Sequence, residues 1–233
     1  MPLKVFTVDE VIERFDDIKI DYKHPSGSYK GATFHKIYID DDELFVKIEG
    51  EVAAGRINPL DYINVSAVNR RSKFPVSKRK YTNATIGFRK HPSNDTVVSK
   101  YFELIEKMNT LAPDITPMIQ THTFENKQLD NPITRVQLKF DEKTMEPKFV
   151  ARDGKTERLE NGKKRYDPLL LDNESVSAEN IHLLTAKSKI TGVVRFSYCK
   201  SKFTNSIVRE FKDILVDLYS YVPSNISFDD VYI

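Results

Sequence analysis

Three residues in the middle of the chain have types and spacing that could hold a metal ion and activate a water molecule. Asp114 follows a proline, and Glu125 and Lys127 come shortly after it, which matches the loose PD…(D/E)xK pattern of metal-dependent nucleases. In that chemistry the carboxylates hold Mg²⁺ while the lysine orients or deprotonates the attacking water. The pattern is short and its spacing is permissive. Pro113 is also expected to end a helix, so a structural interpretation stands beside the catalytic one.

Other catalytic arrangements find little support in the sequence. The five histidines are scattered and have no close histidine or cysteine partner, and Cys199 has no neighbouring histidine. The glycines form neither a GxxxxGK[ST] nor a GxGxxG loop. The acidic run at residues 40–43 is expected to be a hairpin turn rather than a cation site. We therefore predict no cofactor, no metal site and no enzymatic activity.

A basic stretch, "VNRRSKFPVSKRKY" at residues 68–81, has the residue types that bind a polyanion. No acid occurs between Asp61 and Asp95, so the stretch lies in a positively charged window of a chain whose net charge is only +2. Cations attract phosphates, and aromatic rings among them provide surfaces on which bases stack. The window predicts nucleic-acid contacts from Arg70, Arg71, Lys73, Phe74, Lys78, Arg79, Lys80, Tyr81, Arg89 and Lys90.

The composition is that of a soluble globular chain. Hydrophobic residues make up 39% and charged residues 30% of the 233 residues, and no apolar run is long enough to span a membrane. The N-terminus lacks the pattern of a secretory signal. The single cysteine excludes an internal disulfide and favours a reducing compartment. We expect no membrane partner and a cytoplasmic location, with the nucleus as the alternative.

These residues must be positioned by a β-rich fold with few helices. Thr7 and Glu10 form a capping box that predicts a helix beginning at residue 8, and the apolar stripe of residues 96–112 predicts a second helix. Alternating or β-favouring patterns predict strands at 32–50, 61–68, 81–90, 132–140 and 190–200, while residues 206–222 suit either a helix or a strand. The pairs Asp153-Gly154 and Asn161-Gly162 predict turns. No linker is visible, so we expect one domain spanning residues 1–233, with a helical insertion around 96–112.

A series of short motifs runs in order over about a hundred residues of the C-terminal half, with thinner support at 57–59 and 73–80. The motifs are Asn131-Pro132-Ile133 with Arg135 and Lys139, Pro147, Asn161-Gly162-Lys163, Asn180-Ile181-His182-Leu183, Ile190 with Arg195, Ser197 and Cys199, and Asp229-Asp230-Val231-Tyr232. Through these motifs the C-terminal half resembles the single-stranded-DNA-binding proteins of African swine fever virus and related large cytoplasmic DNA viruses. The chain is shorter around the central helix, which leaves inserted elements and oligomer contacts open.

The resemblance implies an α+β fold with an OB-like five-stranded β-barrel core, extra strands and two or three helices. It also implies non-sequence-specific binding of single-stranded DNA, or of RNA, that protects and straightens strands during replication in the host cytoplasm or a viral replication site. Replication proteins such as a DNA polymerase, and other copies of the chain, are the expected partners. Strand residues of the matching region complete the predicted site: Arg135, Lys139, Arg195, Tyr198 and Lys200.

Two alternative functions stay open at this point. One is the nuclease of Asp114, Glu125 and Lys127, and the other is a virion or scaffold protein whose basic face neutralises packaged nucleic acid. The C-terminal residues 227–233 are either a final packed strand or an acidic-aromatic tail that competes for the binding groove.

Overall fold

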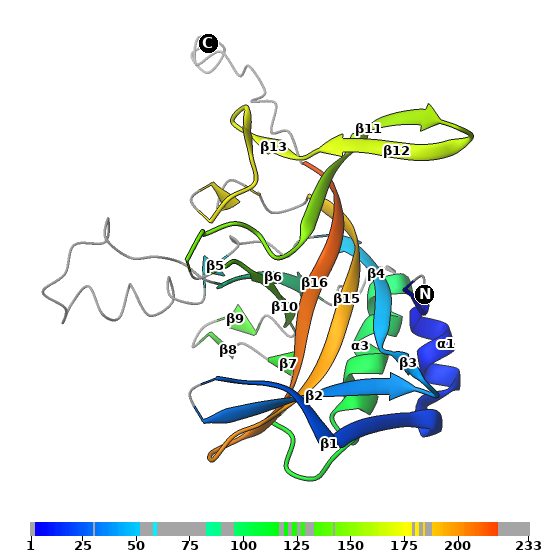
Figure 1. Ribbon diagram of the computed structural model, residues 1–233, viewed down its shortest axis with the longest axis vertical. Coiled ribbons are helices and arrows are strands. Elements are labelled where there is room, and N and C mark those ends of the chain that lie inside the picture. The colour runs from blue at the N-terminus through cyan, green and yellow to red at the C-terminus, as the bar shows by residue number, and fades with distance from the viewer. Residues whose placement is uncertain are drawn as a thin grey trace, which may run out of the picture.

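The computed structural model describes residues 3–29, 31–51, 58–59, 83–89, 96–116, 119–120, 123–124, 127–128, 133–141, 143–178, 180–181, 184 and 188–218. Two α-helices, one short 3₁₀ helix and many strands make up these residues (Figure 1). The elements are α1 (Val8–Glu13), η1 (Phe15–Asp17), β1 (Ile18–Tyr29), β2 (Ala32–Ile39), β3 (Asp42–Glu43), β4 (Phe45–Glu51), β5 (Asn58–Pro59), β6 (Asn83–Arg89), α3 (Thr96–Met108), β7 (Ile119–Gln120), β8 (Thr123–Phe124), β9 (Lys127–Gln128), β10 (Ile133–Lys139), β11 (Val150–Glu160), β12 (Lys163–Pro168), β13 (Leu170–Leu171), β14 (Glu174–Ser175), β15 (Lys189–Lys200) and β16 (Asn205–Asp217).

Five strands form the centre of the molecule in the spatial order β4–β15–β16–β10–β6. All neighbours in this path are antiparallel except β10 and β16, which run parallel. Strands β4 and β6 also contact each other, which brings the two ends of the path together. In chain order this is the 1-4-5-3-2 arrangement of a five-stranded, partly open OB barrel. The predicted β-rich α+β fold with an OB-like core is confirmed.

The barrel interior is filled by the apolar side of each strand. In β10 the alternation has the predicted phase, because Thr134, Val136 and Leu138 are buried while Arg135 and Lys139 remain partly exposed. Of the ambiguous segment, residues 206–217 belong to the long strand β16 rather than to a helix, and Phe211 is fully buried. Twelve paired positions with β15 explain this outcome, since that ladder pairs the backbone along residues 205–217.

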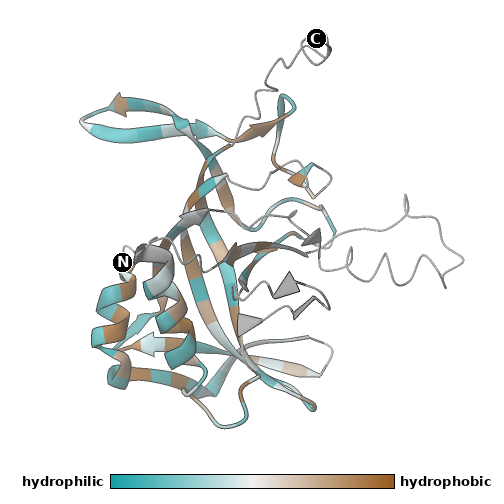
Figure 2. Ribbon diagram, turned by 180° about the vertical axis from the view of Figure 1, so that it is seen from behind, coloured by the Kyte–Doolittle hydropathy of each residue, from teal (hydrophilic) through white to brown (hydrophobic). Residues whose placement is uncertain are grey.

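Both predicted helices are present and cover the barrel at β4 (Figures 1 and 2). Thr7 caps α1 through the expected capping box, in which the Thr7 amide donates to the Glu10 carboxylate at 2.6 Å. The described apolar residues of α3, from Tyr101 to Met108, are buried, and the rings of Tyr101 and Phe88 of β6 pack edge to face at a centroid distance of 6.2 Å. The helices therefore close one side of the core.

Strands β11 and β12 form a ribbon that projects from the body of the molecule (Figure 1). The predicted Asn161-Gly162 turn joins them, and both residues have the positive φ that this turn requires. The turn predicted at Asp153-Gly154 is wrong. These residues lie inside β11 at an irregularity of the register, and a Cβ on Gly154 would lie only 2.2 Å from the Asp217 carboxylate. Close approach of β16, rather than chain reversal, accounts for this glycine.

Candidate nucleic-acid interface

The outward side of the barrel carries cations that are held in place by carboxylates. Glu43 of β3 receives a hydrogen bond from Arg195 of β15 at 2.6 Å and lies 2.8 Å from the Lys36 ammonium of β2. The bond to Glu43 raises the pKa of Lys36, so this cation stays charged. One carboxylate therefore fixes two cations, and the cluster keeps an excess of one positive charge.

A second cluster lies beside the first on the same side. Glu210 of β16 is the register partner of Arg195 and of Gln137, and its carboxylate lies 2.5 Å from Lys212 and 3.1 Å from Lys139 of β10. Only 6% of Glu210 is exposed. Burial alone would raise its pKa, but the ammonium groups of Lys212 and Lys139 outweigh burial and lower the pKa below its ordinary value. Glu210 is therefore an ionised carboxylate that holds two lysines.

We call these residues, together with Arg135, the charged face: Lys36, Glu43, Arg135, Lys139, Arg195, Glu210 and Lys212. Arg135 lies two residues before Gln137 and so points to the same side of β10, where burial lowers the pKa of its guanidinium. The charged face has five cations and two acids. The strands thus bring together three predicted site residues, Arg135, Lys139 and Arg195, and add Lys36 and Lys212.

Aromatic rings lie at one end of the charged face. The Phe34 ring of β2 has the Lys139 ammonium 5.7 Å from its centroid. The loop joining β15 and β16 presents Phe203, which is 87% exposed and has the Lys202 ammonium 5.8 Å from its ring. Ser201 holds the loop by accepting hydrogen bonds from the Phe203 and Thr204 amides. Lys200, a predicted site residue, is exposed at the start of this loop.

The structure corrects the expected exposure of Tyr198. Only 3% of this residue is exposed, because it belongs to the inner side of β15 and packs against His35 and Tyr22. Burial raises the pKa of its phenol. Tyr22 of β1 is the solvent-facing member of this cluster, with 54% exposed. The alternation of β15 already assigned Tyr198 to the apolar side, and that signal outweighs its proximity to cations in sequence.

Most of the predicted basic window lies outside the described residues. This holds for Arg70, Arg71, Lys73, Phe74, Lys78, Arg79, Lys80, Tyr81 and Lys90, while for Arg89 the structure describes the backbone in β6 and not the side chain. The basic stretch at residues 68–81 belongs to the connection between β4 and β6. In the OB arrangement, this connection and the β15–β16 loop are the two loops that flank the ligand-binding strands.

The sequence signals for the remaining site residues were weak. Lys202 and Phe203 are adjacent in the sequence, but many such pairs occur in the chain and only the fold shows that this one occupies an exposed loop. Lys36 lies on a strand far from Arg195 in the sequence, and only strand pairing brings the two together, whereas Lys212 is two residues from Glu210 on β16. No local pattern could have identified them together.

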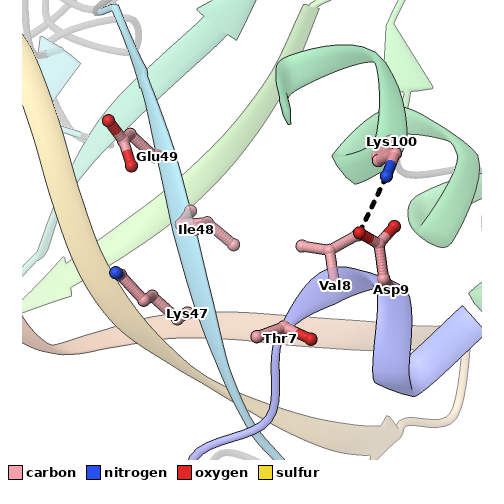
Figure 3. A pocket seen from close by; sticks show the side chains of 7 residues that line it. All are labelled: Thr7, Val8, Asp9, Lys47, Ile48, Glu49 and Lys100. Carbon is pink, nitrogen blue, oxygen red and sulfur yellow. Dashed lines mark hydrogen bonds and ion pairs between the residues drawn. The ribbon is translucent and has the colours of Figure 1, made fainter. Parts of the chain in front are cut away.

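A pocket of about 420 Å³ lies between α1, α3 and β4 (Figure 3). Asp9 and Lys100 form an ion pair of 2.7 Å at its edge, and the other lining residues are Thr7, Val8, Lys47, Ile48 and Glu49. None of these belongs to the charged face.

Within the described ranges, no three His, Cys, Asp or Glu side chains gather where they could hold a metal ion. Asp114 is exposed with φ 60°, whereas the side chains of Glu125 and Lys127 lie outside the described set.

No helix in the described part of the chain is both long and apolar enough to span a membrane. No family model matches the sequence, and no curated protein matches it.

Three solved structures illustrate what the fold is similar to. The single-stranded DNA-binding protein from bacteriophage Enc34 shares 10% identity at a TM-score of 0.40, covering 92% of this chain and 99% of that one. The same phage protein in complex with ssDNA gives 10% identity and a TM-score of 0.41, with 86% and 98% covered. The single-stranded DNA-binding protein gp2.5 of bacteriophage T7 shares 12% identity at a TM-score of 0.37, covering 81% of this chain and 94% of that one. None of these comes from a large cytoplasmic DNA virus, so that part of the resemblance stays a prediction.

Proposed function

We propose that the chain binds single-stranded nucleic acid along the charged face and the β15–β16 loop. Phe203 is the observation that carries this proposal. A phenylalanine that is 87% exposed, with the Lys202 ammonium beside its ring, contributes nothing to the core and provides a flat surface for a base next to a charge for a phosphate. Binding without sequence preference needs this combination, because every base has a stacking face and every nucleotide a phosphate.

The charged face supports the proposal through its five cations and two acids. Glu43 and Glu210 reduce repulsion among these cations and restrict their positions. The phosphates of a single nucleic-acid strand can also reduce the repulsion among these cations. The bases of the same strand can then reach the rings of Phe34 and Phe203. The duplex hides its bases, so stacking cannot add to its affinity. We therefore infer a preference for single strands, and a role in protecting exposed strands during replication.

Fluorescence anisotropy on labelled oligo-dT and on duplex of equal length, across a salt series, tests this function. We expect tighter binding of oligo-dT and a steep loss of affinity with salt. Equal affinity for both forms would support the virion or scaffold alternative and overturn the proposal. Incubating the same oligonucleotides with Mg²⁺ and Mn²⁺ addresses the nuclease alternative, which requires metal-dependent cutting.

A further inference from the structure

The β11–β12 ribbon has no place in the core. Every residue from Lys155 to Arg165 is exposed, and Leu159, near the turn, is 74% exposed. Figure 2 shows the ribbon largely in the hydrophilic colour as it leaves the body. An isolated pair of strands is only marginally stable in water, so a ribbon of this length needs its own stabilising features.

Cross-strand contacts and a tight turn supply these features. The turn has φ of 52° at Asn161 and 72° at Gly162, which matches the twist of a two-stranded ribbon. On one side, Glu157 accepts a bond from the Lys164 ammonium at 2.9 Å and from the Tyr166 hydroxyl at 3.3 Å. Between residues 157 and 166, where the register is continuous, this side carries one acid and one cation and is therefore neutral. The ribbon is thus ordered by contacts that do not involve the core.

The other side of the ribbon concentrates cations. Arg158 and Arg165 are direct register partners across the strands, and Lys163 follows on the same side opposite Glu160. Like charges placed directly opposite each other destabilise a strand pair. Two acids offset this in part, since Asp167 lies 3.4 Å from Arg158 and Glu160 lies 3.3 Å from Arg165. Three cations against two acids leave a positive surface that a phosphate would stabilise.

The base of the ribbon adjoins the charged face. The base of β11 pairs in parallel with β16 directly after the segment that pairs with β10. There, Arg152 of β11 donates to Asp213 of β16, and Asp213 is the register partner of Val193, two residues from Arg195. Charged side chains therefore run from β2 across the barrel to the base of the ribbon.

We propose that the β11–β12 ribbon is a second phosphate-binding element, which uses Arg158, Lys163 and Arg165 to hold the strand where it leaves the charged face. This inference rests on the proposed function. It predicts that the DNA-binding site is longer than the charged face of the barrel. The ribbon contacts only a DNA strand that is long enough to fill the charged face and extend beyond it.

A length series of oligo-dT tests the ribbon. The variant Arg158→Gln/Lys163→Gln/Arg165→Gln should bind an oligonucleotide of about 8 nucleotides, within the range of one OB fold, as the wild type does. For one of about 30 nucleotides we expect about tenfold weaker binding and a salt slope that is shallower by about 2, from about 0.7 per phosphate contact on single strands. Restoring charge with Arg158→Lys/Arg165→Lys and an intact Lys163 should recover most of the affinity.

A matched variant controls for bulk charge. Lys4→Gln/Lys19→Gln/Lys47→Gln removes the same three charges from exposed positions outside the charged face and the ribbon, and should bind both oligonucleotides as the wild type does. Equal losses on short and long oligonucleotides, an unchanged slope on the long one, or the same loss in the control would overturn the inference. Failure of the wild type to bind even the short oligonucleotide would instead overturn the proposed function.

Discussion

At the scale of single residues, the charged face depends on two carboxylates that position its cations. Glu43 and Glu210 each contact two cations within about hydrogen-bond distance, and both lie on strands whose pairing fixes their direction. Carboxylates weaken the electrostatic attraction of a surface for phosphates, but they hold long lysine and arginine side chains in one arrangement. The cations are thus ordered before a ligand arrives.

Phe203 should contribute to binding and not to stability. We expect Phe203→Ala to weaken oligo-dT binding by at least about fivefold and by up to about 150-fold, since stacking on one base contributes roughly 1–3 kcal/mol. The melting temperature should stay at the wild-type value, because the ring is exposed. Anisotropy and thermal unfolding measure the two effects. Phe203→Tyr keeps an aromatic ring and should bind as the wild type does, and normal binding by the alanine variant would exclude stacking at this loop.

Glu210 should make folding sensitive to acid. Its pKa in the folded state is lowered below 4.5, so its contribution to the free energy of unfolding is complete above the unfolded pKa and is lost as the pH falls through the folded pKa. We therefore expect Glu210→Gln to be less stable than the wild type at neutral pH, and the difference to shrink below about pH 4.5. Melting temperatures from pH 7 to pH 3 measure this. Exposed Glu103→Gln is the control, and a constant difference across the range would contradict the argument.

At the scale of elements, the junction of β15 and β16 depends on one close approach. A Cβ on Gly192 would lie 2.6 Å from the Phe211 ring and 2.8 Å from the Asp213 carbonyl oxygen. Both neighbours are held by the ladder, and Phe211 is buried in the barrel. The register is irregular at this point, between Val193 and Val194, which suits a position without a side chain.

The substitution Gly192→Ala should therefore destabilise the protein by about 1–3 kcal/mol, the usual cost of overpacking. Gly154→Ala should cost less, because the exposed Asp217 side chain that it meets can move aside. Gly27→Ala has nothing within 4 Å and is the matched control. Urea denaturation of the three variants measures the order, and a Gly192 variant as stable as the Gly27 variant would show that β16 can shift.

At the scale of the whole molecule, charge is distributed unevenly although the net charge is only +2. The basic stretch at residues 68–81 of the predicted window belongs to the connection between β4 and β6, one of the two loops that flank the ligand-binding strands of an OB barrel. The variant Arg70→Ala/Arg71→Ala/Lys78→Ala/Arg79→Ala should reduce the salt slope for oligo-dT by about 3, from about 0.7 per phosphate contact. An unchanged slope would remove this window from the binding site.

Local sequence patterns correctly predicted four features: the capped helix α1, the amphipathic helix α3, the alternation of β10 and the Asn161-Gly162 turn. Each depends on neighbours within a few residues, so its pattern is visible in the chain. Such patterns misassigned Asp153-Gly154, because the pairing that carries β11 through these residues beside β16 is not visible in the local sequence.

Only the tertiary structure decided that residues 205–217 are a strand, because β15 supplies the ladder that outweighs their mixed propensity. It also decided that Lys36 and Arg195 share Glu43, and that Lys139 reaches Glu210. These contacts join strands that are far apart in the sequence, whereas β15 and β16 are consecutive. The physical reason is that register places side chains on a face, and register between distant strands is set by the packing of the whole barrel.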